Sequence, residues 1–471
     1  MRVCLICEGS YPYVSGGVSS WVQMLCSECS EIEFVIWSIA TTREEMAQHR
    51  YTLPENIKEV HTIYLGDYTF GNHYKKVRLL EDEKTALRNL VNGADNKIEW
   101  GKILKFIKKH RKHLVDILMG EAFFDICLEA YQRKNSKQVF NDFLWTLRGM
   151  YFSTMCSLSG EIPKADIYHT LSTGYAGMLG SSASYIYHKP LVLTEHGIYT
   201  REREEDIIRS NWIHGEFKEM WIEYFRKLSA IAYYQADIVT TLFEQNKSLQ
   251  IELGCPKEKI QIISNGVDVE QFMQLKSQNK VDRACFNIGA VLRVVPIKDV
   301  KSMILAFKLV HEQYANTHLH IMGDCEEDRE YYEECIELIK ALDIENITFY
   351  GQVDIKEYLP DMDLLLLSSI SEGQPLAILE GMSAKIPYIA TNVGSCRELL
   401  EGKKGDILGK AGIIVDIMDC EQMAKAITYC IENPQLLHKM GEVGCKRVQT
   451  SYQKTTFIQA YKNLYKQLGG I

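Results

Sequence analysis

The stretch DLLLLSSISEGQPLAILEGMSAKIPYIATNVG, residues 363–394, indicates the class of fold most directly. Its run of four leucines predicts a strand that is apolar on both faces, as strands are in a parallel sheet covered by helices. The SEGQ segment then reads as a loop, Pro375 suits the first turn of a helix, and PYIATN reads as the next strand. A strand, a loop, a helix and another strand in this order predict an α/β fold with a doubly wound parallel sheet.

The same alternation of apolar runs and helical patterns continues through most of the 471 residues, which are too many for one hydrophobic core. Between about residues 284 and 415, candidate strands alternate with helices, and the first half of the chain carries similar strands. A long helical stretch, at about residues 74–158, interrupts that first half. The candidate strands are VCLIC, FVIWSI, PLVLT, IVTTL, IQIIS, FNIGAVL, HLHIMG, ITFYG, DLLLLSS, PYIATN and GIIV.

We therefore expect two Rossmann-like, doubly wound domains, with the helical insertion in the N-terminal one. The polar segment NGVDVEQFMQLKSQNKVDR follows a strand and marks the joint between them. On this basis the first domain covers residues 1–275 and the second covers residues 276–450. Residues 451–471 have the pattern of an amphipathic helix, which we expect to pack back on the first domain.

Composition and charge narrow the class of protein. Hydrophobic residues make up 46% and charged residues 24% of the chain, which is ordinary for a soluble globular protein. The formal net charge of −9 disfavours a nucleic-acid-binding protein, because such proteins present a dense basic surface to phosphates. No apolar run approaches the roughly 18 residues that span a bilayer, and the N-terminus lacks the pattern of a signal peptide. We therefore expect a cytoplasmic protein with no nucleic-acid partner.

The 14 cysteines are expected to be reduced and buried, as in other cytoplasmic chains. Cys4 and Cys7 form one C-x-x-C pair, and Cys26 and Cys29 form a second at a separation that fits a zinc ribbon. However, the first pair lies in a predicted buried strand and the second in a predicted helix. A structural zinc site needs both cysteines of a pair on a tight turn, so we expect no metal here.

Two glutamates flank the start of the helix that is predicted after the four leucines. Glu372 lies in the loop at the carboxyl end of the strand, and Glu380 lies about one and a half turns into the helix, roughly 7–8 Å along its axis from the helix start. Free N–H groups and the positive end of the helix dipole lie between them, where an anion is stabilised. This order suits a nucleotide sugar, which has hydroxyls at both ends and a diphosphate in the middle. Either glutamate alone would be interpreted as an ordinary solvated side chain.

A second loop supplies positive charge. In FNIGAVLRVVPIKDVKSMILAF a predicted strand leads into a loop that contains Arg293 and Lys298. Two fixed cations at the carboxyl end of a strand can bind a diphosphate and stabilise it as it leaves. A basic loop alone is commonly a solvated surface feature, but this one lies in the same domain as the two glutamates and is a candidate partner for them.

Two loops of the first domain are further candidates. Gly16 and Gly17 follow the first predicted strand and open a helix, where glycines let backbone amides approach a ligand. A plain tight turn explains them equally well. His196 follows the strand PLVLT, where it could bind an acceptor or a sugar hydroxyl. A hydrogen-bonded structural histidine is the alternative at that position.

These motifs, in this order, resemble those of family 4 of the retaining GT-B glycosyltransferases. The resemblance rests on Arg293 and Lys298, and on NGVD before the second domain. It rests also on the E-x7-E spacing of Glu372 and Glu380. EGSYPYVSGGVSSWV, LTEHGIYTRERE, SEGQPLAILEGMSAKIPYIATNVGSCREL and the helical insertion are similar, more narrowly, to glycosyltransferases of Pel exopolysaccharide synthesis. The resemblance implies the GT-B fold, in which two Rossmann-like domains face a central cleft.

The resemblance also implies roles for the matching residues. Arg293 and Lys298 would bind the donor diphosphate, and Glu380 would hydrogen-bond the ribose. Glu372 would face the donor sugar, and His196 would lie near that sugar and the acceptor. The remaining implied contacts, with the base, the phosphates or the acceptor, come from Gly16, Gly17, Gly351, Gln352, Val353, Leu376 and Ala377.

The sequence departs from the commoner pattern of that family in one place. Gln374 and Pro375 stand where phenylalanine and glycine are usual. Because proline has no N–H, the amides that meet the phosphate would be those of Leu376 and Ala377. The departure bears on the phosphate contacts rather than on the class of reaction.

The implied reaction is the transfer of a hexosyl unit, with retention, from a UDP-sugar to a growing exopolysaccharide such as Pel. UDP-glucose and UDP-N-acetylhexosamines are the expected donors. No metal or other cofactor is implied, since DMD at residues 361–363 leads into a predicted buried strand and is not a metal-binding loop. The implied partners are the UDP-sugar, a polysaccharide acceptor and membrane-embedded components of a polysaccharide synthase.

Other functions stay open at this point. A glycosidase also uses two carboxylates but needs no diphosphate clamp. A nucleotide-sugar epimerase shares the fold and has no acceptor. A non-catalytic nucleotide-sugar sensor in a membrane synthase complex would bind the donor and turn nothing over.

The helical insertion contains EWGKILKFIKKHRKHLVDIL, which places Trp100, Ile103, Leu104 and Ile107 on one helix face. The polar side of this helix is rich in lysine, arginine and histidine. A helix packed on its domain with a solvated basic face has this pattern. So does a helix that contacts an anionic membrane or a membrane partner, which would hold the protein at the inner face of the plasma membrane.

Overall fold

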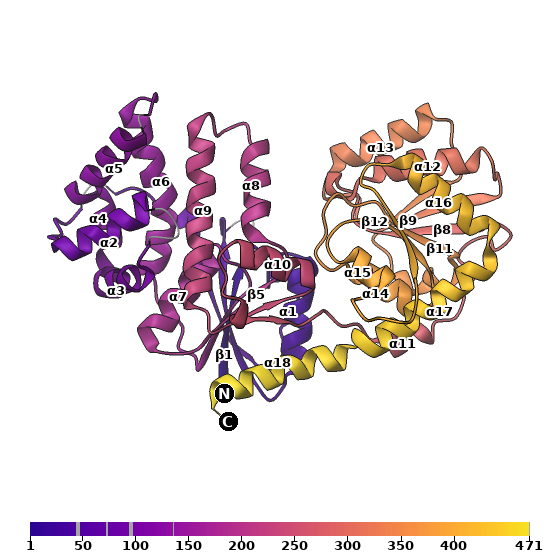
Figure 1. The fold of residues 1–471 in the computed structure, drawn as a ribbon, viewed down its shortest axis with the longest axis horizontal. Coiled ribbons are helices and arrows are strands. Elements are labelled where there is room, and N and C mark those ends of the chain that lie inside the picture. Colours follow the sequence, from indigo (N-terminus) through magenta and orange to yellow (C-terminus); the bar gives the residue numbers. More distant parts are fainter. Residues whose placement is uncertain (44–47, 72–73, 94–97, 135, 471) are drawn as a thin grey trace. The chain divides into compact units, whose positions relative to one another are not determined.

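The computed structural model describes residues 1–43, 48–71, 74–93, 98–134 and 136–470. It divides the chain into two compact units, of which the first contains Met1–Ile262 with Tyr461–Ile471 and the second contains Ile263–Ala460. Each unit is built on one parallel sheet with helices on its faces (Figure 1). This is the two-domain α/β architecture that the sequence predicts.

The sheet of the first unit has seven parallel strands in the order β3-β2-β1-β4-β5-β6-β7. The strand order runs outward in both directions from β1 and β4, so the sheet is doubly wound. Its strands are β1 (Arg2–Glu8), β2 (Glu33–Ala40), β3 (Ile57–Tyr64), β4 (Ile167–Thr170), β5 (Leu191–Glu195), β6 (Ile238–Thr241) and β7 (Ile260–Ile262).

The sheet of the second unit has six parallel strands in the order β10-β9-β8-β11-β12-β13. It is also doubly wound, outward from β8 and β11. Separate hydrophobic clusters pack on its two faces. Its strands are β8 (Phe286–Val291), β9 (Thr317–Met322), β10 (Ile347–Gly351), β11 (Leu364–Leu367), β12 (Tyr388–Thr391) and β13 (Gly412–Val415).

Helices connect the strands and cover the sheets. Those that begin in the first unit are α1 (Gly17–Glu28), α2 (Glu81–Asn92), α3 (Trp100–His110), α4 (Leu114–Met119), α5 (Glu121–Lys134), α6 (Phe140–Ser159), α7 (Tyr175–Tyr187), α8 (Tyr199–Arg209), α9 (Glu216–Gln235) and α10 (Glu244–Glu252). Those that begin in the second are α11 (Val269–Met273), α12 (Val300–His311), α13 (Arg329–Ala341), α14 (Leu376–Ser383), α15 (Cys396–Glu401), α16 (Cys420–Glu432), α17 (Pro434–Ser451) and α18 (Lys454–Gly469).

The helical insertion of the first unit is formed by α2 to α6. It lies beside α7 and α9 (Figure 1). On α3, the apolar side chains Trp100, Ile103, Leu104 and Ile107 are all buried in the core of the unit. The Lys109 ammonium on the polar side of α3 pairs with Glu83 of α2. The helix therefore packs on its own domain, as the first of the two alternatives for this segment requires.

The joint between the units differs from the expected one, because residues 263–275 belong to the second unit. Val267 forms a bridge with Gln453, and Phe272 of α11 packs in the core of the second unit. These contacts draw the chain into the second unit as soon as β7 ends. At the other end of the chain, α18 runs from Lys454, and its residues from Tyr461 onward belong to the first unit.

The four cysteines of the C-x-x-C pairs are buried, in or next to the first strand and first helix. Cys4 and Cys7 lie in β1, Cys26 lies in α1, and Cys29 directly follows that helix. Within the described residues, no group of three or more His, Cys, Asp or Glu side chains is arranged to hold a metal ion. In the same part of the chain, no helix is both long and apolar enough to cross a membrane.

Candidate functional site

The carboxyl ends of β8 and β11 are neighbours at the point where the strand order of the second sheet reverses. In open α/β sheets this switch point is where ligands bind, because the loops leaving the two strands part there. Lys298 lies in the loop after β8, and Glu372 lies in the loop after β11. The two loops are joined, since the Ser368 hydroxyl donates to the Lys298 carbonyl at 2.7 Å and the Ile370 N–H donates to the Ile297 carbonyl at 2.8 Å.

The side chains of Lys298 and Glu372 meet at this switch point. The Lys298 ammonium lies 2.5 Å from Oε1 of Glu372, and the Ser369 hydroxyl donates to the same oxygen at 2.6 Å. Both partners are largely buried, with 17% and 11% of their side chains exposed. An ammonium has three N–H donors, so Lys298 can hold Glu372 and still donate to an anion. The pair therefore offers a fixed carboxylate and a fixed cation side by side.

Arg293 occupies the same loop as Lys298 but has a different partner. Its guanidinium pairs with the carboxylate of Glu327, at 2.5 and 2.7 Å from the two oxygens. About half of each side chain is exposed. An exposed pair of this kind contributes little to stability and can be displaced by another anion. Arg293 is thus placed at the carboxyl end of β8, with Glu327 as its competing partner.

Glu380 lies in the second turn of α14 and is partly buried. Burial raises the pKa of its carboxyl from 4.5 to about 7, and the charge of Lys356 opposes that shift in part. Near neutral pH the group is therefore divided between the carboxyl and the carboxylate forms. Each form can hydrogen-bond a hydroxyl group, the first as donor or acceptor and the second as acceptor only.

The start of α14 lies between the two glutamates, as the sequence predicts. Pro375 is the residue before the helix, and Leu376 and Ala377 are its first residues. No side chain caps this end, so the first N–H groups of the helix remain available to an anion. The Gln374 side chain does not cap the helix, because its Oε1 accepts from the backbone N–H of Asn265 at 2.6 Å.

Gly351, Gln352 and Val353 lie at the carboxyl end of β10, the edge strand of the same sheet. Gly351 has a φ of +64°, which is the left-handed region that favours glycine. Its carbonyl accepts from the N–H of Gly323 at 2.9 Å. The segment is thus on the same edge of the sheet as Lys298 and Glu372, two strands further from the switch point.

The first unit has its own pocket, of about 510 Å³, at the carboxyl ends of its central strands. Glu8 at the end of β1, Ser172 after β4 and His196 after β5 line it, as do Tyr199 and Arg203 of α8. The pocket therefore lies at the switch point between β1 and β4, the position equivalent to that of Lys298 and Glu372 in the second sheet.

His196 is the sequence-predicted residue in this pocket. Desolvation lowers the pKa of its imidazole from 6.5 to about 4, so the ring is neutral near pH 7. The ring meets Trp21 edge to face, with centroids 5.0 Å apart. Its Nε2 atom is buried and has no hydrogen-bond partner among the described residues. A neutral imidazole with one ring nitrogen unused can bind a hydroxyl group.

Glu8 is a pocket residue that the sequence analysis did not select. Its carboxylate accepts from the Ser172 hydroxyl, the Ala176 N–H and the Tyr199 hydroxyl, at 2.9, 3.0 and 2.8 Å. Its position at the carboxyl end of a predicted strand could have identified it, since the same position makes His196 a candidate. Glu8 fixes the loop after β4 and the start of α8 around the pocket.

Gly16 and Gly17 lie at the start of α1, outside the residues that line this pocket. A Cβ atom at either position would meet no protein atom within 4 Å. The fold itself therefore does not require glycine there. The other site residues fall into two groups, with His196 in the first unit and the remainder in the second, where Lys298 and Glu372 touch.

Comparison with known proteins gives two family matches. Residues 1–258 match the model described as Domain of unknown function (DUF3492), and residues 275–447 match the model described as Glycosyl transferases group 1. Among curated proteins, N-acetyl-alpha-D-glucosaminyl L-malate synthase of Bacillus anthracis is 26% identical over 239 residues. That match covers 49% of this chain and 60% of the relative, so the chain spans less than two thirds of that relative's length.

The capsular polysaccharide biosynthesis glycosyltransferase CapM of Staphylococcus aureus is 24% identical over 305 residues, which are 62% of this chain and 74% of CapM. Among solved structures, Anabaena HepE in complex with UDP has a TM-score of 0.62 at 16% identity, over 99% of this chain and 100% of that chain. This likeness shows the GT-B fold. Since the first family model covers more than half of the residues, the protein belongs to the family of the domain of unknown function DUF3492, joined in this chain to a glycosyl transferases group 1 domain.

Proposed function

We propose that this protein is a retaining glycosyltransferase of family 4, which moves a hexosyl unit from a UDP-sugar to a growing exopolysaccharide. The observation that carries the proposal is the contact between Lys298 and Glu372 at the switch point of the second sheet. A cation for a leaving phosphate and a carboxylate for sugar hydroxyls are the two groups that such a donor needs side by side. The proposed donors are UDP-glucose and UDP-N-acetylhexosamines, and the proposed product is an exopolysaccharide such as Pel.

In the proposed reaction, the bond between the anomeric carbon and the phosphate oxygen of UDP breaks. The acceptor oxygen bonds to the same face of that carbon, and the acceptor proton passes to the leaving phosphate. Lys298 and Arg293 stabilise the negative charge that collects on the diphosphate, together with the N–H groups of Leu376 and Ala377. No enzyme nucleophile takes part, and no metal ion is needed, because side-chain cations and helix amides bind the leaving group.

The carboxylates of the second unit have positioning roles in this scheme. Glu372, held by Lys298 and Ser369, accepts hydrogen bonds from hydroxyls of the donor sugar. Glu380 hydrogen-bonds the ribose, and the backbone of Gly351–Val353 meets the uracil. These contacts hold the donor in one orientation, which lowers the entropic part of the barrier to transfer.

The acceptor is assigned to the pocket of the first unit. His196 is neutral near pH 7 and has a buried ring nitrogen with no hydrogen-bond partner among the described residues, so it is suited to a hydroxyl of the acceptor.

Two further observations support the proposal that the protein is a glycosyltransferase. The second unit matches a glycosyltransferase model, and HepE, which shares the fold, has been crystallised with UDP-glucose. Membrane-embedded synthase components are the proposed partners for export of the product.

A product assay with the full chain tests this function. The protein is incubated with each of a panel of UDP-sugars, with and without short oligosaccharide acceptors, and UDP release and products are measured. The proposal predicts a lengthened oligosaccharide with one donor, and Glu372→Gln is expected to reduce its rate about 100-fold or more. Glu337→Gln, an exposed glutamate on α13, is the matched control and keeps the rate.

The other outcomes identify the alternatives. Conversion of the UDP-sugar to its epimer without an acceptor would make the protein an epimerase. Tight UDP-sugar binding with neither product nor UDP release, in the presence of the membrane fraction as well, would make it a sensor. Both results contradict the proposed transfer.

A further inference from the structure

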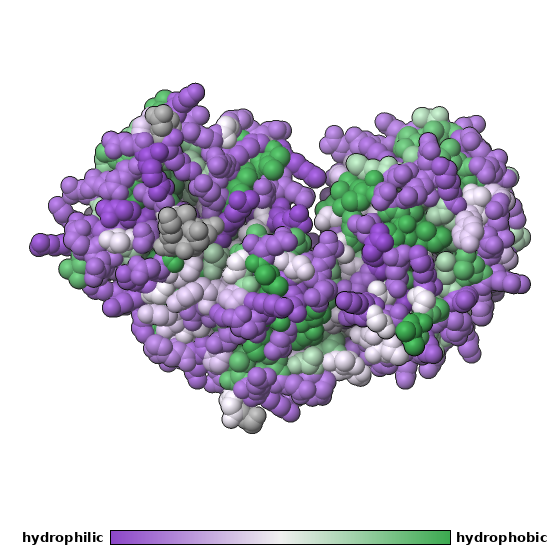
Figure 2. All heavy atoms as spheres, viewed as in Figure 1, coloured by the Kyte–Doolittle hydropathy of each residue, from purple (hydrophilic) through white to green (hydrophobic). Residues whose placement is uncertain are grey.

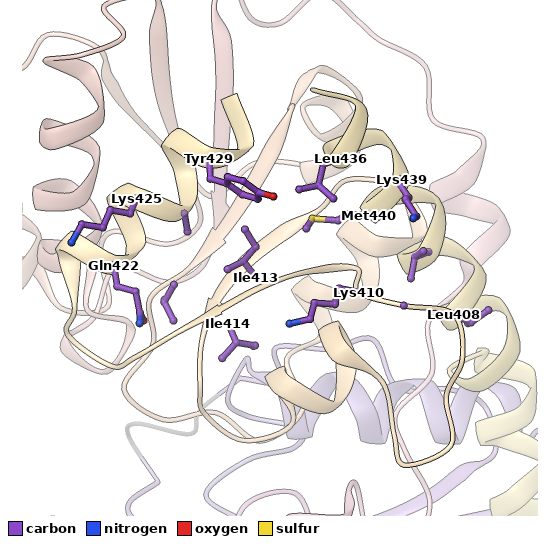
Figure 3. A pocket seen from close by; sticks show the side chains of 14 residues that line it. Leu408, Lys410, Ile413, Ile414, Gln422, Lys425, Tyr429, Leu436, Lys439 and Met440 are labelled. Carbon is purple, nitrogen blue, oxygen red and sulfur yellow. The ribbon is translucent and has the colours of Figure 1, made fainter. Parts of the chain in front are cut away.

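A groove of about 700 Å³ runs along the open edge of the sheet in the second unit, away from the site described above. Strand β13 is the last strand of that sheet and pairs with β12 on one side only. Figure 3 shows Ile413 and Ile414 of β13 between two helices, with Tyr429 from α16 on one side and Leu436 and Met440 from α17 on the other. The groove therefore joins a strand edge to two apolar walls.

The backbone of β13 has hydrogen-bonding groups directed into this groove. The Val415 carbonyl accepts from the N–H of Asn392, beside β12, at 2.9 Å. Because backbone groups alternate in direction along a strand, the N–H and carbonyl of Ile414 face the open side. Asp416, the next residue in that orientation, donates its N–H to Oε1 of Gln422 from α16. At Asp416 the Gln422 side chain thus accepts the hydrogen bond that a neighbouring strand would accept. The backbone groups of Ile414 lie next to this position along the same edge.

The surroundings of the groove are apolar and exposed. Tyr429 is 50% exposed in the groove itself, and the adjoining loops carry Ile407 at 95% and Met418 at 64% exposure. Figure 2 shows a hydrophobic area on this face of the second unit, over the region where Figure 1 labels β12 and α16. Clustered apolar exposure of this kind marks an interaction surface.

The rim of the groove carries three lysines, although the whole chain has a net charge of −9. Lys410, Lys425 and Lys439 line it, from the loop before β13, from α16 and from α17. Lys410 pairs with Glu401 at 2.8 Å, and Lys425 lies 3.7 Å from Glu421. Exposed lysines at three points around an apolar groove are complementary to a partner whose own apolar residues are interleaved with carboxylates.

We propose that this groove binds an extended acidic segment of a partner protein, which adds to β13 as a further strand. Main-chain hydrogen bonds to the open edge hold the segment, alternate apolar side chains fill the space between α16 and α17, and its carboxylates meet the lysines. A flat anionic membrane would reach the exposed loops but could not pair with a strand edge recessed between two helices. The inference is independent of the proposed glycosyl transfer, since it uses none of the residues assigned to that reaction.

A peptide-binding experiment with the full chain tests the proposal. The probe is a fluorescein-labelled peptide of about nine residues in which valine and glutamate alternate, long enough to pair along a strand. Fluorescence anisotropy is expected to show micromolar binding, and hydrogen exchange is expected to slow at Gly412–Val415. The double variant Lys425→Glu/Lys439→Glu is expected to bind the peptide about tenfold or more weakly. Lys340→Glu, an exposed lysine on α13, is the matched control and binds as the natural chain does.

Further arms separate strand addition from charge attraction and from membrane binding. Ile414→Pro removes one edge N–H at a position where proline is tolerated and is expected to abolish binding. A peptide with lysine in place of glutamate is expected not to bind. Absence of binding by the acidic peptide, equal binding of both peptides, or unchanged affinity in the double lysine variant would overturn the proposal. Sedimentation with phosphatidylglycerol vesicles through the same lysines, without peptide binding, would assign the surface to membrane instead.

Discussion

The ionisation of Glu380 couples the stability of the second unit to pH. Its pKa is raised from 4.5 to about 7 in the folded protein. The folded state therefore holds a proton that the unfolded chain has lost between these two values, and stability falls as pH rises through this window. Above about pH 7 both states are ionised and the effect is constant.

The first prediction is that Glu380→Gln removes this pH dependence. The urea midpoint of the natural chain is expected to fall, relative to that of the variant, as pH rises from 4.5 to 7. It should then stay level relative to the variant up to pH 8. Glu337→Gln, at an exposed position on α13, is the control. A constant difference between natural chain and Glu380→Gln over the whole range would show that the Glu380 carboxyl has an ordinary pKa.

The second prediction concerns the pairing of Arg293 with Glu327. A UDP diphosphate must displace this carboxylate to reach the guanidinium. Glu327→Gln keeps the size of the side chain and removes its charge, so the affinity for UDP is expected to rise about two- to fivefold, the range of an exposed ion pair. Calorimetric titration measures it, with Glu330→Gln, an exposed neighbour on the next helix, as the control. An unchanged or weaker affinity would mean that Arg293 does not meet the diphosphate.

At the scale of elements, the loop after β11 is shaped by a glycine from a different loop. Gly394 has a φ of +51°, and a Cβ there would lie 2.3 Å from the carbonyl oxygens of Glu372 and Gly373. The third prediction is therefore that Gly394→Ala displaces Glu372 and weakens UDP binding about tenfold. It should also lower stability by about 1–3 kcal/mol.

Gly405→Ala separates these two effects. Gly405 also has a positive φ, of +93°, but a Cβ there would meet nothing within 4 Å. This control should share the cost of the backbone conformation and leave UDP binding as it was. If both variants weaken UDP binding equally, the contact between Gly394 and the Glu372 loop does not explain the effect.

Most of the strands could be predicted because they are apolar on both faces, as four leucines show in β11 and VCLI shows in β1. The predictions missed β3 and β4. The sequence of β3, IKEVHTIY, mixes charged and apolar residues because it is an edge strand, open on one side. β4 has only four residues, and two of them are the buried polar residues His169 and Thr170. His169 bonds to Tyr465 and Thr194, which are distant in the sequence, and the Thr170 hydroxyl donates to the nearby Ser172 carbonyl.

At the scale of the whole chain, the last helix returns the C-terminus to the first unit. The imidazole of His169, in β4, is fully buried, and desolvation lowers its pKa to about 3, so the ring is neutral. Its Nδ1 shares a hydrogen bond of 2.6 Å with the Tyr465 hydroxyl, and its Nε2 shares one of 2.7 Å with Thr194. The C-terminal residues thus complete the hydrogen bonding of a buried strand.

The fourth prediction is that Tyr465→Phe destabilises the first unit by about 1–3 kcal/mol, because it leaves a buried ring nitrogen without its partner. Hydrogen exchange is expected to speed up in β1 and β4, with the second unit unchanged. Tyr187→Phe, at a partly exposed position in the same unit, is the control. Equal exchange in the two variants would show that the C-terminal contact does not stabilise the strand.

The candidate site was predictable in part, for reasons that differ between its residues. Glu372, Lys298 and His196 follow apolar strands, so their placement at the carboxyl edges of the sheets followed from local pattern. The direct contact of Lys298 with Glu372 could not be predicted from local pattern. It depends on β8 and β11 being neighbours, which is a property of the strand order. The competing partner of Arg293 and the role of Glu8 likewise come from residues far away in the sequence.

Calorimetric titration of the full chain with UDP, with GDP and ADP as controls, tests whether the Lys298–Glu372 pair belongs to a donor site. We predict selective binding of UDP that is lost in Lys298→Ala and weakened in Arg293→Ala, while the double lysine variant of the groove binds UDP as the natural chain does. Absence of binding to all three nucleotides, or UDP binding that Lys298→Ala leaves unchanged, would contradict the assignment of the Lys298–Glu372 pair to a donor site.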